Sequence, residues 1–327
     1  MKIRHQAFWV LILTGVCWLT LTNGHALAAA KDDFPNRPIT FIAGWPGGGG
    51  GDQEIRGFAL YLRKYLPVSL VIENLPGAAT KIAVTKAWKA KPDGYTMVYI
   101  TPPQQILNEF MSKVEYKTSE FVPVYSFMKR SFAMTVNSET YKTVDEFLKE
   151  AKTRTMSIGL SSFGSAAHLE ALSSAKAWGI KANWVPYETG SQAVTQVAGK
   201  HIDAAFTAAA TALPLMRGGK IRALLIFSPT PVDGFEGVPG PAELGYKMPI
   251  ISGLGGIVAP PKTPASVVKI LEDACAKTVK DPEFLAWATK AQYEVIQLRS
   301  EGFRKELQGQ YKIVEDNISM IMESMPK

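Results

Sequence analysis

The feature that most constrains the fold is a run of five consecutive glycines, Gly47–Gly51, between a hydrophobic segment and a helical pattern. The preceding segment, Ile39–Ala43, is rich in β-branched and aromatic residues, the composition of a buried strand. Asp52 is a preferred helix N-cap residue, and apolar residues recur at helical spacing after it. Glycines let backbone N–H groups face a ligand, and a helix N-terminus carries partial positive charge, so this arrangement predicts an anion site. A flexible surface turn is the alternative, but a turn does not require five glycines.

The N-terminal segment has the features of a secretory signal peptide. Two basic residues within the first four positions precede an apolar segment, Phe8–Leu21, and A-x-A cleavage sites follow, after Ala28 or Ala30. The apolar segment is shorter than the ~20 residues of a spanning helix, which argues against a membrane anchor. We therefore expect residues 1–30 to be removed and the mature protein to be exported.

The charge does not indicate a nucleic-acid-binding protein, and the cysteine content does not allow an internal disulfide in the mature chain. The chain of 327 residues has 36 Lys and Arg against 29 Asp and Glu, and loss of two basic residues with the signal peptide leaves 34 − 29 = +5. The basic residues are scattered, which suits an anionic ligand and does not indicate nucleic acid. Cys17 lies in the signal peptide, so Cys275 would be left without an internal disulfide partner. Apolar neighbours at helical spacing predict that Cys275 is a core thiol.

Further strand–loop–helix units follow the glycine loop. In order they are a strand over Val68–Asn74, a turn over Leu75–Ala79, a helix over Lys81–Lys89 and a strand over Tyr95–Thr101. Successive βα units imply a right-handed, parallel, doubly wound sheet. In such sheets ligands bind at the carboxyl ends of the strands, where the glycine loop lies.

The second half of the chain repeats this design. After an extended segment, Val122–Val136, that is expected to cross between domains, a strand over Met156–Leu160 leads through Ser161–Ser165 into a helix. Later expected elements are strands over Trp184–Tyr187, Asp203–Thr207 and Ala223–Phe227, a helix over Ser191–Ala198, a surface loop over Ser228–Gly245 and helices from Pro264 to the end. Two α/β halves that each present a helix N-terminus predict a two-lobed clamp around an anion.

Several known motifs are absent. The dinucleotide fingerprint would need glycine where Asp52 stands, and no Gly-Lys-Ser/Thr closes the loop as in a P-loop. A nucleophile elbow starting at Gly159 would need glycine where Phe163 stands. The two histidines beyond the signal peptide, His168 and His201, have no metal-ligand spacing, so we expect neither a metal nor a cofactor.

Four single residues near the predicted loops are candidates for structural or ligand-binding roles. We expect Asp52 to position the glycine loop and to reach a ligand through water, because a carboxylate repels an anion. Lys81 is either a cation at a loop tip or a solvated helix lysine, and Trp45 either walls the pocket or packs in the core. For His168 a structural or interlobe hydrogen bond is favoured over a ligand contact.

These motifs resemble those of the substrate-binding receptors of tripartite tricarboxylate transporters, the TctC-like or Bug family of periplasmic solute receptors. The resemblance covers almost the whole mature chain. The matching segments are Arg37–Ile39, Pro46–Asp52 with Arg56, Glu73–Ala78, Pro92–Thr96, Ser161–Ser165 with His168, Val185–Tyr187, Gly219–Leu224, Glu243–Gly245 and Ala259–Pro264. The chain departs from the family at Ala79–Lys81, where Gly-Gly-Asn is frequent.

The resemblance implies an α/β, two-lobed periplasmic-binding-protein fold of the Venus-flytrap, type II-like kind. Each lobe would be a doubly wound sheet with flanking helices: residues 31–128 with 252–327 form lobe 1, and 129–251 form lobe 2. It also implies a monomeric periplasmic receptor whose partners are the membrane components of a cation-driven importer. The ligand would be a carboxylate held mainly by backbone N–H groups and water from both lobes. The candidate ligand-binding residues are Trp45, Gly48, Gly49, Gly50, Gly51, Asp52, Ala78, Ala79, Lys81, Ser161, Ser162, Phe163, Gly164, Ser165, His168, Tyr187 and Asp203.

We therefore expect a non-enzymatic receptor for a small organic carboxylate. Two alternatives stay open. One is an exported ligand sensor for a membrane signalling partner. The other is an exported enzyme that uses the glycine loop as an oxyanion or phosphate site, although no nucleophile–base pair, metal cluster or cofactor motif supports it.

Overall fold

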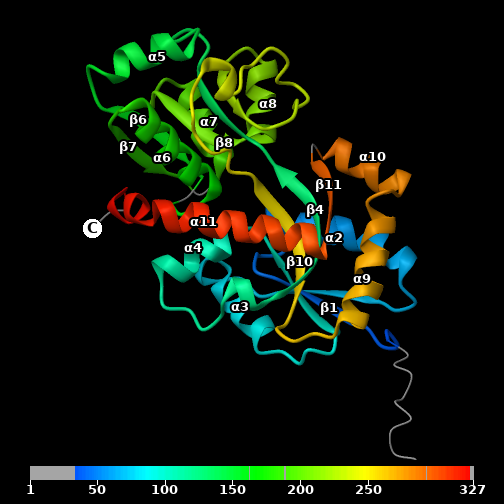
Figure 1. The fold of residues 1–327 in the computed structure, drawn as a ribbon. Helices are drawn as coiled ribbons and strands as arrows, with labels where there is room; N and C mark the ends of the chain where they lie inside the picture. The colour runs from blue at the N-terminus through cyan, green and yellow to red at the C-terminus, as the bar shows by residue number, and fades with distance from the viewer. Residues whose placement is uncertain (1–33, 162, 188, 292, 325–327) are drawn as a thin grey trace, which may run out of the picture. The chain divides into compact units, whose positions relative to one another are not determined.

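Two mixed β-sheets with flanking helices make up the part of the chain that the computed structural model describes, residues 34–161, 163–187, 189–291 and 293–324 (Figure 1). Both sheets belong to one unit that begins at Arg37. The predicted signal peptide and Ser162 lie outside the described residues. Among the helices that the structure describes, none is long and apolar enough to cross a membrane.

The first lobe contains the six-stranded sheet, in the order β11-β4-β10-β3-β1-β2. Its strands are β1 (Ile39–Ala43), β2 (Leu70–Asn74), β3 (Thr96–Ile100), β4 (Val122–Arg130), β10 (Gly253–Ala259) and β11 (Glu294–Arg299). Its helices are α2 (Gly50–Leu62), α3 (Lys81–Trp88), α4 (Gln104–Met111), α9 (Ala265–Thr278), α10 (Pro282–Lys290) and α11 (Ser300–Ser324), with short 3₁₀ turns over Arg63–Tyr65, Ala78–Thr80 and Thr118–Glu120.

The second lobe contains the five-stranded sheet, in the order β7-β6-β8-β5-β9. Its strands are β5 (Phe132–Asn137), β6 (Met156–Leu160), β7 (Ala182–Pro186), β8 (Ala204–Ala208) and β9 (Ile221–Phe227). Its helices are α5 (Val144–Ala151), α6 (Ala166–Trp178), α7 (Gly190–Ala198) and α8 (Ala209–Arg217), with a 3₁₀ turn over Ala242–Leu244.

The expected parallel pairing holds for only part of each sheet. β1 pairs in parallel with β2 and β3, and β6 pairs in parallel with β7 and β8. β10 runs antiparallel to β3 and β4, and β5 runs antiparallel to β8 and β9. The antiparallel strands arise because β4 carries the chain out of the first sheet and β10 brings it back.

The chain crosses between the sheets in extended conformation at Ser131, as the segment Val122–Val136 predicts. β4 and β5 lie on either side of this residue, one in each sheet. The Ser131 N–H and hydroxyl donate to Glu294 of β11 at 3.0 and 3.1 Å, and the Ala209 N–H of α8 donates to the Ser131 carbonyl at 2.9 Å. The crossing residue is therefore bonded to both lobes. The return crossing lies between β9 and β10.

The C-terminal region departs from the prediction, because β11 interrupts the expected run of helices. The segment Glu294–Arg299 pairs antiparallel with β4 and completes the sheet edge. The long helix that follows, α11, contacts β4 and α4 in the first lobe and α6 in the second (Figure 1). Leu169 and Leu172 of α6 accordingly share one buried hydrophobic cluster with Leu307 and Ile321 of α11.

Cys275 confirms its predicted place in the core. Its side chain is 1% exposed on α9, and burial raises the pKa of its thiol well above the ordinary value. A thiol in this setting stays protonated and unreactive.

Candidate functional site

The glycine loop leads directly into α2, which begins at Gly50 with Gly49 as its N-cap. The prediction that Asp52 is the N-cap is therefore wrong, because the last glycines continue into the first helical turn. Asp52 lies in that turn, is 2% exposed, and accepts a hydrogen bond from the Gly48 N–H at 2.7 Å. Its carboxylate thus ties the loop to the helix, which is the positioning role expected for it.

Two neighbouring side chains complete this tie. Asn74, at the end of β2, donates its amide to the Asp52 carboxylate at 2.7 Å and to the Trp45 carbonyl at 3.0 Å. Arg56 donates to Asp52 at 2.7 Å and to the Asn74 side-chain oxygen at 2.5 Å. Burial would raise the pKa of Asp52, but the bonds from Asn74, Gly48 and Arg56 outweigh it and the pKa is lowered.

Trp45 and two of the glycines fix the shape of the loop. Gly48 has a φ of +81°, a conformation that L side chains rarely adopt. The Trp45 ring lies over Gly51 so closely that a Cβ on that glycine would stand 2.4 Å from the ring. Trp45 therefore packs on the loop backbone, which matches the packing role that the sequence left open for it.

A cavity of about 540 Å³ lies between the two lobes beside the glycine loop. Gly50 and Glu54 of α2 line it from the first lobe, and Ala208–Thr211 at the start of α8 line it from the second. Arg130 and Ser131 of the crossing lie between them. Two helix N-termini from different lobes thus border one cavity, an arrangement that favours an anionic ligand.

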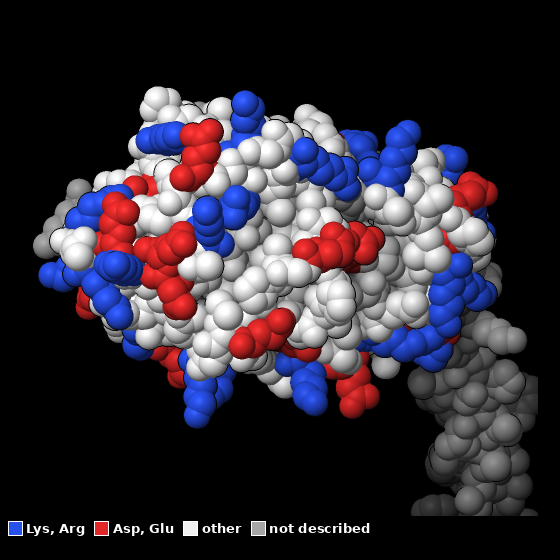
Figure 2. Space-filling view, turned by 90° about the horizontal axis from the view of Figure 1, so that it is seen from above, with Lys and Arg blue, Asp and Glu red and all other residues white. Residues whose placement is uncertain are grey.

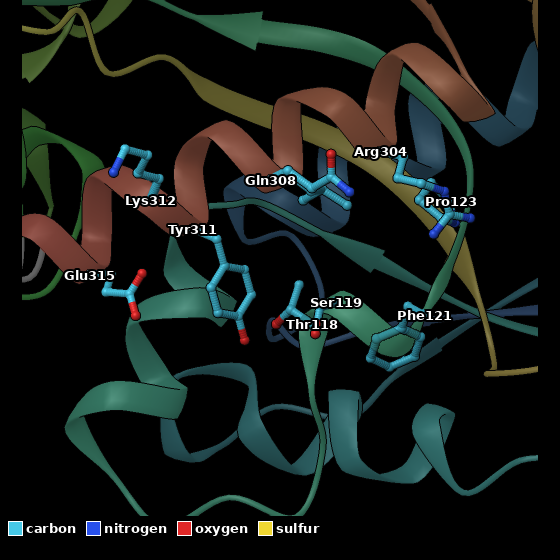
Figure 3. A pocket seen from close by; sticks show the side chains of 10 residues that line it. Thr118, Ser119, Phe121, Pro123, Arg304, Gln308, Tyr311, Lys312 and Glu315 are labelled. Atoms are coloured by element: carbon cyan, nitrogen blue, oxygen red, sulfur yellow. The ribbon is translucent and has the colours of Figure 1, made fainter.

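The α8 side of this cavity was not predicted from the sequence. Ala208 ends β8 and Ala209–Thr211 open α8, so small residues again join a strand to a helix N-terminus. Among the described residues, Gly50 is the predicted ligand-binding residue that lines the cavity. A second cavity, of about 280 Å³, lies between Thr118–Pro123 and α11, so first-lobe residues alone line it (Figure 3).

The predicted second-lobe loop also lies close to the first lobe. Ser165 is the N-cap of α6, and its hydroxyl accepts from the His168 N–H at 3.2 Å. A Cβ on Gly164 would lie 3.1 Å from the sulfur of Met111, at the end of α4. Ser161, Phe163 and Ser165 are half-buried, and Ser162 lies outside the described residues.

His168 makes an interlobe hydrogen bond. It is fully buried on α6, its Nδ1 accepts from the Gly164 N–H at 3.1 Å, and its Nε2 lies 3.1 Å from the Ser324 hydroxyl of α11. Because Nδ1 accepts, the proton is assigned to Nε2, which donates to Ser324, and the Ser324 hydroxyl donates to the Ile321 carbonyl at 2.6 Å. Burial lowers the pKa of His168 to about 4, so the ring is neutral at pH 7.

This neutral histidine predicts a loss of stability in acid. The unfolded chain takes up the proton near pH 6.5 and the folded chain only near its pKa of about 4, so the free energy of unfolding falls as pH drops between these values. A pKa of about 4 in the folded chain against 6.5 in the unfolded chain lowers the free energy of unfolding by ~3 kcal/mol over that range.

Urea unfolding at a series of pH values from 7 to 4 measures this loss of stability. His168→Asn should flatten this dependence, whereas His201→Asn, at an exposed histidine, should leave it unchanged; equal slopes in all three proteins would contradict the prediction.

Four of the remaining predicted ligand-binding residues lie beyond the carboxyl ends of β2 and β7. Lys81 starts α3, beyond the carboxyl end of β2, and donates to the Ser112 hydroxyl at 3.0 Å. Ala78 and Ala79 are exposed beside it with φ of +48° and +52°. Tyr187 directly follows β7 and is half-buried.

Asp203 is at the wrong end of its strand for the predicted role. It precedes β8, accepts from Arg154 at 2.6 and 2.9 Å, and accepts from the Ser157 N–H at 2.7 Å. β6 and β8 run parallel, so Asp203 lies at their amino ends, whereas the loop that starts at Ser161 follows the carboxyl end of β6. The Asp203 carboxylate therefore pairs with Arg154 and accepts a hydrogen bond at the start of β6, which is a structural role.

The chain is similar to known proteins along most of its length. A family model described as the tripartite tricarboxylate transporter family receptor, TctC, matches residues 55–321. Protein BugT of Bordetella pertussis is 29% identical over 256 residues, which cover 76% of this chain and 78% of the relative. A protein described as UPF0065 protein in gbd 5'region, from Cupriavidus necator, is 27% identical over 88% of this chain and 90% of its own length.

Solved structures show the same two-lobed fold. A TctC solute-binding protein from Polaromonas superposes with a TM-score of 0.79 at 28% identity, covering 88% of this chain and 99% of that one. MatC from Rhodopseudomonas palustris, solved with bound malate, gives a TM-score of 0.71 at 22% identity over 86% and 99% of the two chains. Rpa4515 from the same organism, solved with adipate, gives 0.73 at 22% over 86% and 98%. At this lower identity the likeness of the last two concerns the fold.

Proposed function

Because this chain belongs to the tripartite tricarboxylate transporter receptor family, TctC, we propose that it is an extracytoplasmic receptor that binds a small organic carboxylate between its two lobes. The observation that carries the proposal is the interlobe cavity bordered by the N-termini of α2 and α8. Backbone N–H groups at such ends donate hydrogen bonds to a carboxylate, so that no dedicated cation is needed. The malate and adipate bound to MatC and Rpa4515 support the choice of ligand class.

We assign ligand contacts to the loops that follow the parallel strands. In the first lobe these are Gly48–Gly51 and the turn at Ala78 and Ala79. In the second lobe they are Ser161–Ser165, Tyr187 and the start of α8. The lobes themselves are proposed to comprise residues 31–128 with 252–327 and residues 129–251, which the crossing at Ser131 supports.

Lys81 is proposed to distinguish dicarboxylates from monocarboxylates. It begins α3 beside the exposed turn at Ala78 and Ala79, and its partner Ser112 adjoins Met111, which the Gly164 loop approaches. A second carboxylate at this point would need a positive partner, because burying an unpaired charge is costly.

Calorimetric titration of ligand-stripped, refolded protein with malate, adipate and their monocarboxylate analogues tests the proposal. We expect Lys81→Ala to weaken the best dicarboxylate by about 2 kcal/mol or more and to spare its monocarboxylate analogue. Lys86→Ala, on the same helix, is the matched control, because Lys86 pairs with Glu73 instead. If Lys81→Ala changes neither affinity, Lys81 is an ordinary helix lysine, and the half-buried rings of Trp45 and Phe163 would favour an aromatic or apolar carboxylate.

The cellular setting follows the family. We propose that the protein is exported to the periplasm and passes its ligand to the membrane components of a tripartite tricarboxylate-type transporter, as a monomer. On the face shown in Figure 2, basic and acidic residues are interspersed, which fits a small-molecule receptor better than a nucleic-acid-binding protein.

A ligand sensor for a membrane signalling partner remains the second candidate, since the same cleft would serve it. A turnover screen on carboxylate and phosphate esters separates both from an enzyme.

A further inference from the structure

We propose that Arg56 is a positioning residue for ligand binding. Its guanidinium compensates the buried negative charge of Asp52, so that the glycine loop can bind an anion although the Asp52 carboxylate holds the loop in place. This inference rests on the proposed function, because it concerns the same glycine loop.

The glycine loop contains an electrostatic conflict. Asp52 is nearly fully buried and accepts the Gly48 N–H, so a negative charge lies within the loop that is proposed to bind an anion. Like charges at short range in a partly buried site repel strongly. An uncompensated Asp52 would therefore offset the attraction that the N-terminus of α2 offers to a carboxylate.

The contacts of Asp52 show which group relieves the conflict. The Asp52 carboxylate accepts a hydrogen bond from the Gly48 N–H of the loop and another from the uncharged side-chain amide of Asn74 on β2. It accepts a third hydrogen bond from the guanidinium of Arg56 on α2, which is the charged group that acts on it. The neighbouring charge on β2, Glu73, pairs with Lys86 of α3.

Two hydrogen bonds hold the Arg56 side chain in one position beside Asp52. Arg56 is one helical turn after Asp52 and also donates to the Asn74 side-chain oxygen at 2.5 Å. Asn74 in turn holds the Trp45 carbonyl. The Arg56 side chain is 48% exposed, whereas Asp52 is 2% exposed, so the compensating charge lies at the surface beside a buried carboxylate.

Removing the charge of Arg56 should weaken anion binding more than it weakens the fold. We expect Arg56→Gln to raise the dissociation constant of the tightest-binding probe among malate, adipate and their monocarboxylate analogues ~10-fold or more, with the midpoint of urea unfolding nearly unchanged. Arg63→Gln is the matched control, because it removes the same charge from the exposed turn just after α2. Its affinity should equal that of the wild type.

A second variant separates the charge effect from a merely structural one. Asp52→Asn in the Arg56→Gln background removes the uncompensated carboxylate, and we expect it to recover most of the lost affinity. If Arg56 served only packing, the double variant would bind more weakly than the single one.

Proton linkage supplies an independent readout. Without Arg56, the bonds and charge that lower the pKa of Asp52 are partly lost, so anion binding near pH 5 should draw a proton onto Asp52. Calorimetry in two buffers of different ionisation enthalpy measures this uptake, and Arg56→Gln should take up more protons than the wild type does with the same ligand at the same pH. A wild type that binds none of these probes overturns the proposed function and this inference with it. A wild type that binds, with Arg56→Gln binding equally well and taking up no more protons than the wild type, overturns the inference alone.

Discussion

Gly50→Val is expected to abolish carboxylate binding while leaving the fold intact. Gly50 is the first residue of α2 and lines the interlobe cavity. A Cβ added there meets no atom within 4 Å, and the backbone does not adopt a positive φ, so valine fits without strain. Its branched side chain would instead occupy the space through which a carboxylate reaches the helix N-terminus.

We expect the dissociation constant of a bound carboxylate to rise ~100-fold or more, about 2.7 kcal/mol, in calorimetric titrations. The free energy of unfolding should fall by less than ~1 kcal/mol, the scale of helix-propensity differences. Gly309→Val is the matched control, since Gly309 is an exposed helical glycine of α11 whose Cβ also meets nothing within 4 Å. Unchanged affinity in Gly50→Val would place the ligand elsewhere.

Arg130→Met is expected to cause a large loss of stability, about 3–5 kcal/mol in the free energy of unfolding. Arg130 ends β4 and donates to both carboxylate oxygens of Glu54, at 3.0 Å from Nε and at a shorter distance from Nη2. It also donates to the Leu254 carbonyl of β10 at 3.3 Å. Glu54 is 3% exposed, so without Arg130 its carboxylate would be buried with the Tyr99 hydroxyl, at 2.6 Å, as its remaining partner.

Urea unfolding of three variants separates the charge from the packing. Glu54→Gln combined with Arg130→Met removes both charges of the pair and should recover part of the lost stability. Lys129→Met, at the neighbouring half-buried residue of β4, is the matched control and should cost less than Arg130→Met. Equal losses for Lys129→Met and Arg130→Met, or a double variant no more stable than Arg130→Met, would show that the pair does not anchor the crossing.

Local patterns predicted the elements that position the site. The β-branched segment Ile39–Ala43 and the glycine run are sufficient to predict β1, its loop and α2, because strand composition, turn chemistry and helical spacing agree there. Likewise Met156–Leu160 and the small residues after it predict β6 and the start of α6. The extended segment Val122–Val136 predicts the crossing, and β4 and most of β5 lie within it on either side of Ser131.

Long-range contacts account for what the sequence could not supply. Asp52 has the residue type of an N-cap, but its partners Asn74 and Gly48 come from β2 and the loop, and they decide its position in the first turn. β11 exists because β4 offers it an edge, a partner more than 160 residues earlier, as the pairing of Glu294 with Lys129 shows. The start of α8 follows the same pattern as the glycine loop, yet its alanines have no distinctive composition. The sequence predicts Asp203 at the start of its strand, but it does not show that the carboxylate accepts hydrogen bonds from Arg154 and the Ser157 N–H at that end of the sheet.

Closure of the two lobes on a carboxylate is most directly measured by small-angle X-ray scattering of the ligand-stripped protein, with and without a saturating carboxylate shown to bind by calorimetry. Hinge bending is expected near Val124–Phe132 and Ser252–Val258, where β4 and β10 connect the sheets. We expect the ligand to lower the radius of gyration of the wild type and to leave that of Gly50→Val unchanged. Superimposable curves for the free and the fully liganded wild type would contradict a receptor that closes on its ligand.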